Sequence, residues 1–274
     1  IVKEVRPTEI YNFAAMSQVR ISYDMPAYTG DVTGVGFARI LETVRNLDPS
    51  IKIYQASSSE MFGKVQEVPQ TETTPFYPRS PYGCAKAYSF YLGRAFREGY
   101  GLRVYNGILF NHESPRRGEC FLSQKVVRAA VRIHAGQQDK LKLGNLEARR
   151  DWGYAREYCE WIWHIMQYPE PMDFLIATGE NHTVEEFVAE TFACLGMEWR
   201  EHVMQDPDLM RPAEVDELLG DASKARRLLG FEPKVRFKEL VRLMVDYELK
   251  AFSNPRGYPA DADRMGCELA VSVG

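Results

Sequence analysis

Apolar positions along the chain follow two different periods. Short apolar runs are typical of buried strands, and they occupy residues 9–15, 51–56, 103–110, 140–143 and 174–177. Apolar residues at helical spacing predict helices over residues 31–46, 121–135, 154–168, 183–196, 221–230 and 237–252. Because strands and helices alternate in the first half of the chain, we predict an α/β fold with a parallel sheet and right-handed crossovers.

Polar, Pro- and Gly-containing stretches separate these elements. Residues 111–118, 149–153 and 210–215 are predicted as loops. Gly34 and Gly36 superficially match the start of a dinucleotide-binding fingerprint, but that fingerprint needs a strand immediately before it. We therefore interpret the two glycines as close-packing positions within a helix.

Chemistry-bearing side chains gather where the second predicted strand ends. Three serines, among them Ser58, and then Glu60 follow this strand, and ligands of open α/β sheets bind at that end. Pro81 favours a helix start that places Tyr82 and Lys86 four residues apart on one face. A hydroxyl, a carboxylate, a phenol and an ammonium in one crevice form a proton-transfer set. The alternative is a serine-rich turn beside a surface Tyr–Lys pair.

The Tyr82–Lys86 pair has a physical reason for its spacing. A tyrosine has a reference pKa of about 10 and is a poor base at neutral pH. A lysine ammonium one helical turn away stabilises the phenolate and is expected to lower that pKa. Ser58 is able to share the same substrate proton. The three residues together resemble the Ser–Tyr–Lys set of the short-chain dehydrogenase/reductase superfamily.

Glu60 adds a function that hydride transfer alone does not require. A carboxylate beside a phenolate is electrostatically unfavourable, because both groups are negatively charged. Its presence is explained if a second proton has to be removed. Oxidation of a sugar at C4 acidifies the C5–H bond, and a base at C5 then permits loss of water from C6. The alternative interpretation of Glu60 is an ordinary turn or helix-start carboxylate.

Composition narrows the class of protein. The 274 residues are 45% hydrophobic and 26% charged, as in an ordinary soluble protein. A net charge of −4 gives no electrostatic case for nucleic acid or an anionic membrane, and no apolar run approaches the roughly 20 residues that span a bilayer. The five cysteines contain no CxxC, which favours reduced thiols in the cytoplasm, and neither they nor the dispersed histidines predict a metal site.

Longer segments resemble the GDP-mannose 4,6-dehydratase family. Residues 54–67 read YQASSSEMFGKVQE, residues 72–83 read ETTPFYPRSPYG, and residues 107–118 read GILFNHESPRRG. Shorter matches are RDWG at 150–153, IATG at 176–179 and RPAEV at 211–215. The resemblance extends over residues 9–249, nearly the whole chain, and its FNHESPRRG segment is long and specific.

The resemblance implies an extended short-chain dehydrogenase fold that uses NADP. Its sheet is a doubly wound, Rossmann-type parallel sheet, with a smaller, mainly helical C-terminal substrate domain. Residues 1–111 are then the dinucleotide-binding domain, and residues 112–254 mainly the sugar-nucleotide-binding domain, with 139–180 returning to the first. Residues 255–274 are predicted to be a mobile or docking tail.

The resemblance also implies a role for each matching residue. Ser58 and Tyr82 would be catalytic, Glu60 the base at C5, and Lys86 both the pKa-tuning residue and a ribose ligand. The implied cofactor contacts are Phe13, Ala14, Ala15, Met16, Ser17, Tyr28, Lys86, His112 and Arg117. The implied substrate contacts are Asn111, Lys125, Arg150, Arg211 and Glu214. The implied reaction converts GDP-mannose to GDP-4-dehydro-6-deoxy-mannose, with hydride leaving C4 and returning to C6.

The chain departs from the family pattern in two places. The family carries a strand and a Gly-rich phosphate loop ahead of this region, so we expect either a longer natural protein or a decayed fragment. The family also has Gln and His where this chain has Met16 and Gln18, which affects contacts on the nicotinamide side.

Three functional hypotheses remain open at this stage. The first is the dehydratase. The second is a nucleotide-sugar epimerase or a 4-keto-6-deoxy-sugar reductase, neither of which needs Glu60, and the third is a non-catalytic nucleotide-sugar-binding protein. The resemblance implies a homodimer or homotetramer, and the aromatic face of the helix over residues 90–96 indicates an interface.

Overall fold

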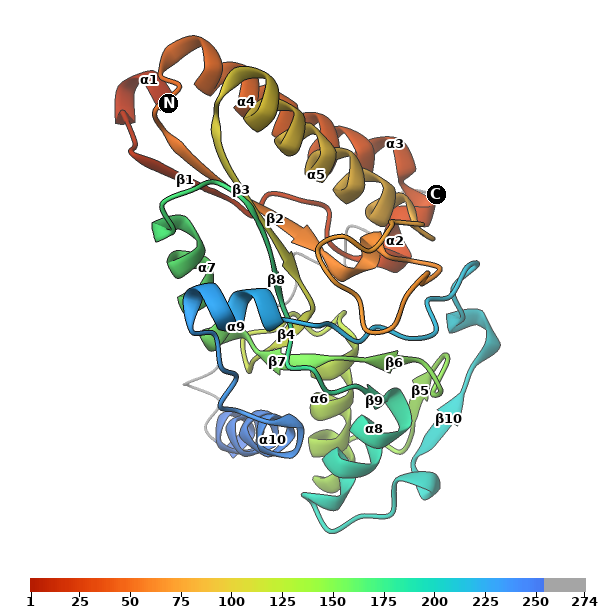
Figure 1. The fold of residues 1–274 in the computed structure, drawn as a ribbon. Coiled ribbons are helices and arrows are strands. Elements are labelled where there is room, and N and C mark those ends of the chain that lie inside the picture. The colour runs from red at the N-terminus through yellow and green to blue at the C-terminus, as the bar shows by residue number, and fades with distance from the viewer. Residues whose placement is uncertain (254–274) are drawn as a thin grey trace.

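The computed structural model describes residues 1–253, and its centre is a four-stranded sheet (Figure 1). The strands lie in the order β1 (Glu9–Asn12), β2 (Lys52–Ser58), β3 (Arg103–Leu109) and β8 (Asp173–Ile176). All neighbouring strands are parallel, and Ser58 pairs with Leu109, so β2 and β3 end side by side. The predicted α/β class with a Rossmann-type parallel sheet is thereby confirmed.

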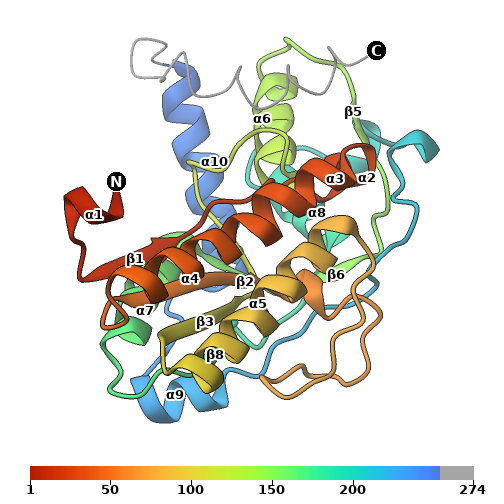
Figure 2. The same ribbon diagram turned by 90° about the horizontal axis from the view of Figure 1, so that it is seen from above.

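Helices pack on the sheet from both sides. α4 (Gly36–Leu47) and α5 (Pro81–Tyr100) cover one face, while α7 (Ala155–Gln167) packs on β2, β3 and β8, and α9 (Ser223–Leu229) on β8 (Figure 2). The buried positions of α4 recur at helical spacing and form a core with β2 and β3. The preceding elements are α1 (Val2–Val5), α2 (Val19–Asp24), α3 (Pro26–Thr29) and a π-helical turn, Gly30–Val35.

The core around the sheet buries one face of several of the predicted helices. Tyr158 and Ile165 of α7 are buried there, so the aromatic face of this helix packs in the core. Phe90 of α5 belongs to the same core, so it does not contribute to an exposed interface. Gly34 packs against Tyr88, since a Cβ atom added to it would lie 3.1 Å from the tyrosine ring. The close-packing interpretation of Gly34 is therefore confirmed.

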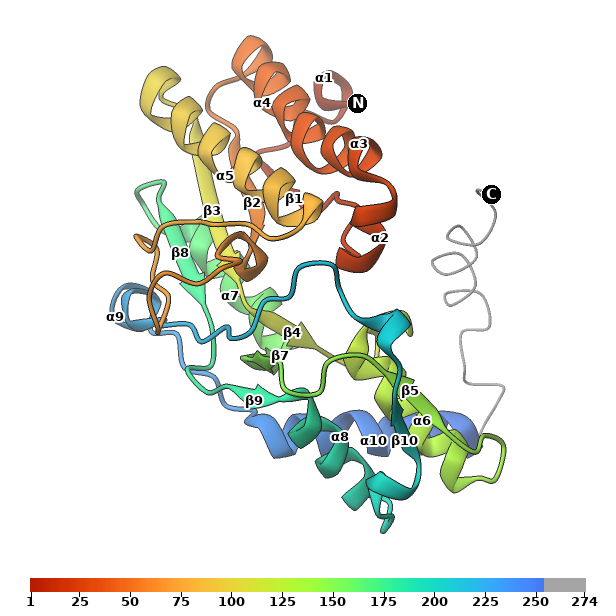
Figure 3. The ribbon, with the colours of Figure 1, turned by 90° about the vertical axis from the view of Figure 1, so that its right-hand side faces the viewer.

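A second group of helices forms a separate core beside the sheet (Figure 3). It contains α6 (Leu122–His134), α8 (Val184–Ala193) and α10 (Phe237–Ser253), with the strand pair β5 (Leu141–Leu143) and β10 (Val203–Gln205). A capping box formed by Thr183 and Glu186 starts α8. Short 3₁₀-helices occupy Ser59–Met61, Trp199–Glu201 and Pro207–Leu209. The domain boundaries stay a prediction, and the predicted tail lies outside the described residues.

Two stretches predicted as loops contain short strands instead. β4 (Asn111–Glu113) pairs in parallel with β7 (Trp152–Tyr154), and β6 (Arg149–Arg150) pairs antiparallel with β9 (His182–Thr183). Strands of two or three residues are too short to show a period, and they form because distant partners satisfy their backbone groups. β4 directly follows β3, and it carries site residues away from the sheet edge.

Among residues 1–253, no helix combines the length and the apolar character needed to cross a membrane.

Candidate active site

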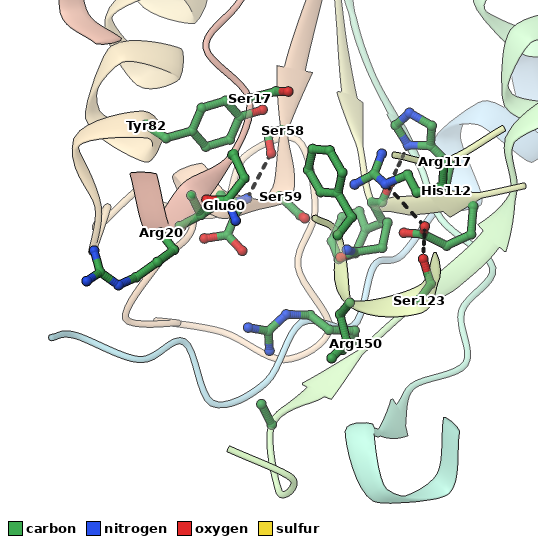
Figure 4. Close-up of a pocket in the computed structure, with 18 of the residues that line it drawn as sticks. Ser17, Arg20, Ser58, Ser59, Glu60, Tyr82, His112, Arg117, Ser123 and Arg150 are labelled. Carbon is green, nitrogen blue, oxygen red and sulfur yellow. Dashed lines mark hydrogen bonds and ion pairs between the residues drawn. The ribbon is translucent and has the colours of Figure 1, made fainter. Parts of the chain in front are cut away.

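A cavity of about 410 Å³ lies where β2 and β3 end, between the sheet and the helical group (Figure 4). Tyr82, Ser58 and Glu60 stand on one side of it, and His112 and Arg117 on the other. The cavity therefore lies at the carboxyl edge of a parallel sheet, where α/β proteins bind ligands.

The structure brings most of the predicted site residues to this cavity. Its lining includes the four predicted catalytic residues, all five predicted substrate contacts, and Phe13, Ala15, Ser17, His112 and Arg117 of the predicted cofactor contacts. Ala14, Met16 and Tyr28 do not line it, and Tyr28 is half exposed on α3. The roles of all these residues stay predictions.

The start of α5 places Tyr82. Ser80 is the N-cap, and its hydroxyl accepts a hydrogen bond of 3.0 Å from the Gly83 backbone N–H. Pro81 occupies the first turn, so Tyr82 points from the helix start toward the end of β2, where Ser58 lies. Burial raises the pKa of Tyr82 to about 12, while Ser58 acts in the opposite direction.

Lys86 lies one turn further along α5, and it faces the sheet. Its Nζ donates a 2.7 Å hydrogen bond to the Ala56 carbonyl of β2 and lies 5.7 Å from the centre of the Tyr82 ring. Burial lowers the pKa of Lys86 to about 8. The expected lowering of the Tyr82 pKa by Lys86 is thus not found in the chain alone, because desolvation of the phenol dominates.

Glu60 presents one unpaired oxygen to the cavity. The residue is 9% exposed, and its backbone N–H donates a 3.2 Å hydrogen bond to Ser58 Oγ. Its Oε1 lies 3.4 Å from Nη1 of Arg211, whereas Oε2 is buried without a hydrogen-bond partner. A buried, unpartnered carboxylate oxygen is costly to maintain, and a base that must accept a proton requires such an oxygen.

A chain of alternating charges continues from Glu60. Arg211 also lies 3.6 Å from Glu214, which in turn lies 3.5 Å from the buried Arg150. Arg150 donates a 2.7 Å hydrogen bond to the Val215 carbonyl, which ties it to the loop that carries Arg211 and Glu214. Two guanidinium groups facing one cavity suit an anionic ligand, because their planar donors pair with phosphate oxygens.

β4 and the residues after it form the opposite wall. His112 Nδ1 is 2.8 Å from the Phe110 carbonyl, and its ring stacks on Tyr158 at 5.1 Å. Burial lowers the pKa of His112 to about 4, so its ring is neutral at physiological pH. The Arg117 guanidinium lies 3.9 Å from the centre of the Phe121 ring, and its Nε is 3.3 Å from Glu113.

Sequence reasoning missed several lining residues. Glu113, Ser123, Arg20 and Ser59 line the cavity but were not predicted as site residues. Glu113 carried a usable signal, since it is a carboxylate within the matching FNHESPRRG segment, whereas Ser123 lies beyond that segment. Arg20 carried none, because it lies on the six-residue helix α2, which has no clear period. Residues 1–253 contain no cluster of His, Cys, Asp or Glu side chains suited to a metal ion.

The parallel sheet together with the Ser–Tyr–Lys set defines a member of the extended short-chain dehydrogenase/reductase class. A family model described as GDP-mannose 4,6 dehydratase matches residues 1–244. The chain belongs to the GDP-mannose 4,6-dehydratase family.

Curated relatives and solved structures agree with this placement. GDP-mannose 4,6 dehydratase of Cricetulus griseus is 50% identical over 275 residues, covering 93% of this chain and 74% of the relative. GDP-mannose 4,6 dehydratase 1 of Arabidopsis thaliana is 51% identical over 250 residues, covering 90% and 69%. UDP-glucose 4-epimerase of Thermotoga maritima, solved with UDP-glucose, superposes with a TM-score of 0.81 at 26% identity, covering 92% of this chain and 80% of that one. RMD of Pseudomonas aeruginosa, solved with NADPH, has the same fold, with a TM-score of 0.81 at 21% identity, covering 89% and 82%.

Proposed function

We propose that the protein is a GDP-mannose 4,6-dehydratase, which converts GDP-mannose to GDP-4-dehydro-6-deoxy-mannose and water. The observation that carries this proposal is the free Oε2 of Glu60 beside Ser58 and Tyr82. An epimerase or reductase of the same fold needs the hydroxyl and the phenol but not this carboxylate. Relatives about 50% identical bear the name of this activity.

The cavity also fits a dinucleotide. Its wall at the end of β1 is made by Phe13, Ala15 and Ser17, and the Lys86 ammonium and Arg117 guanidinium face the same space. Small side chains and cations of this kind suit the ribose and phosphate groups of NADP. Bound NADP would accept a hydride from C4 of the sugar and return it to C6 within one turnover. Lys86, His112 and Arg117 would hold it.

The residues of the chain divide the proton transfers between them. Tyr82 takes the C4 hydroxyl proton, and Ser58, which lines the same cavity, hydrogen-bonds that hydroxyl. Oxidation at C4 makes the C5 proton acidic, and Glu60 Oε2 removes it. The C6 hydroxyl leaves as water with the proton that Glu60 removed, which leaves a C5–C6 double bond. The proton held by Tyr82 is then available for C5, and a hydride supplied by the cofactor at C6 would complete the redox-neutral reaction.

The arginines in the chain of charges that begins at Glu60 would bind the substrate. Arg150 and Arg211 face the cavity, and each is paired with Glu214. The diphosphate of a sugar nucleotide would replace part of this pairing and hold the hexose next to Tyr82. Asn111 and Lys125 line the cavity between this end and the sheet edge.

The decisive experiment compares the natural full-length protein with its Glu60→Gln variant. The parent should form a 4-keto, 6-deoxy product from GDP-mannose, detected by mass spectrometry as loss of one water. Glu60→Gln should lose at least about 100-fold in dehydration, the low end expected for a general base, while retaining NADP binding. Glu42→Gln on the exposed side of α4 is the matched control and should retain activity.

Two outcomes would overturn the proposal. Dehydration that persists in Glu60→Gln removes Glu60 from the mechanism. A parent protein that epimerises C4 or only reduces a 4-keto sugar, without loss of water, belongs to the alternative class.

We further propose that the protein works as a homodimer or homotetramer in the cytoplasm. Exposed aromatic residues on α5 support an assembly, since Tyr88, Tyr91 and Tyr100 are each about half exposed on its outer side. Light scattering on the purified protein tests the assembly, and a monomer over the micromolar range contradicts it.

A further inference from the structure

Glu113 is a buried carboxylate to which the proposed mechanism gives no task. It is the last residue of β4 and only 2% exposed, yet it lies at the wall of the catalytic cavity. A charge in such a place is costly unless several groups pair with it. The partners that Glu113 has therefore indicate what it does.

Three side chains converge on this carboxylate. The Ser123 hydroxyl, in the first turn of α6, donates a hydrogen bond to Oε2, and Arg117 Nε lies 3.3 Å from the same oxygen (Figure 4). Burial raises the pKa of Glu113, while Arg117, Ser123 and Asn111 each act to lower it and so favour its ionised form. Arg117 is a proposed cofactor contact and Asn111 a proposed substrate contact, so Glu113 joins the two.

Arg117 is held in one orientation by two independent contacts. Glu113 Oε2 forms an ion pair with the Nε atom at 3.3 Å, without hydrogen-bond geometry, and the Phe121 ring lies against the face of the guanidinium at 3.9 Å. This leaves the outer N–H groups of a rigid, planar fork directed to the cavity that Arg117 lines. Without Glu113, the ring contact alone would permit the guanidinium to rotate in its plane.

We propose that Glu113 is a positioning residue that orients Arg117 for the anionic cofactor and, through Asn111, aligns the substrate wall with it. The inference rests on the proposed function for the identity of the cofactor. It assigns Glu113 no contact with the reacting atoms.

A double-mutant cycle on NADP binding tests the inference without any turnover. The natural full-length protein and its Glu113→Gln, Arg117→Gln and doubly substituted variants are titrated with NADP by calorimetry. Glu113→Gln should weaken NADP binding by about tenfold, and it should cost nothing further once Arg117 is replaced. Glu180→Gln, which removes an exposed ion pair with Arg236, is the matched control and should leave the affinity unchanged.

The outcomes separate a positioning role from a merely structural one. Equal losses from Glu113→Gln in both backgrounds, or no loss at all, overturn the inference, as does a parent protein that does not bind NADP. Should Glu113→Gln fold poorly, Ser123→Ala removes only one hydroxyl donor and should weaken NADP binding by a few-fold, again only when Arg117 is present. If the protein does not dehydrate GDP-mannose but the double-mutant cycle gives the expected result, the proposed reaction is overturned and the role of Glu113 remains supported.

Discussion

Arg211 Nη1 lies 3.4 Å from Oε1 of Glu60, so a cation from a loop 151 residues away along the chain faces the carboxylate beside Ser58. The same guanidinium also lies near Glu214. Arg211 therefore stands between the proposed base and the proposed phosphate-binding end of the cavity, and both should respond when it is changed.

Replacement of Arg211 should weaken both binding and turnover. We expect Arg211→Gln to raise the KM for GDP-mannose and to lower kcat, with a combined loss of at least about tenfold in kcat/KM, since a charge-assisted contact is worth about 1.5–3 kcal/mol. Arg211→Lys should recover only part of the loss, because the ammonium lacks the planar fork. Arg236→Gln, at an exposed ion pair, serves as the control in steady-state assays. Unchanged kinetics in Arg211→Gln would contradict the assignment.

Lys86 should cost the protein stability at neutral pH. Its pKa is lowered from 10.5 to about 8, so below pH 8 the folded state holds a charge that burial disfavours. Lys86→Met should abolish activity and raise the free energy of unfolding at pH 7 by at most about 3 kcal/mol, less the loss of the donor to Ala56.

The pH dependence provides the check on this prediction. The advantage of Lys86→Met should shrink as the pH rises from 8 toward 10.5, because the wild-type lysine then becomes neutral in the folded state while the unfolded chain still binds the proton. Urea unfolding at several pH values measures the difference. If the difference in unfolding free energy between Lys86→Met and the wild type does not change with pH, burial of the ammonium is not its cause.

Gly153 should tolerate no side chain. A Cβ atom at this position would lie 2.4 Å from the Tyr158 ring, the ring on which His112 stacks. Gly153→Ala should lower the free energy of unfolding by about 1–3 kcal/mol through overpacking. Gly99→Ala near the end of α5, where nothing lies within 4 Å, should instead be neutral or stabilising by up to about 1 kcal/mol. Thermal unfolding of both variants tests the contrast, which would fail if the two substitutions had equal effects.

Loss of the Ser80 cap should affect stability and catalysis together. Ser80→Ala removes the acceptor for the Gly83 N–H and should cost about 1 kcal/mol of unfolding free energy. It should also lower kcat, because the first turn of α5 carries Tyr82. Thr183→Ala removes the corresponding cap of α8, a helix that does not carry Tyr82, and should cost similar stability while sparing kcat. Comparable kcat losses in both variants would contradict a local effect.

Sequence patterns predicted the parts of the fold that repeat. The strands β2 and β3 and the amphipathic helices α6 and α10 were expected within one or two residues of their observed bounds, because apolar periodicity persists over several positions. β4 and β7 were missed, since three residues are too few to show a period and the two strands lie about 40 positions apart.

The same limit applies to the site. Tyr82 and Lys86 could be predicted as neighbours because they share a helix, whereas the contact between Glu60 and Arg211 depends on how two distant loops fold. The pKa of Tyr82 was expected to fall because the sequence shows a nearby lysine but not the burial of the phenol. Long-range packing decides both properties.

The register of β4 against β7 constrains how this protein can vary in length. Asn111 pairs with Trp152, His112 with Gly153 and Glu113 with Tyr154, and successive residues of a strand face opposite sides. Insertion or deletion of one residue would therefore exchange the two faces and direct His112 toward the partners of Glu113. Substitutions within β4 can be absorbed one at a time, but changes of length there should be absent from every functional descendant of this chain.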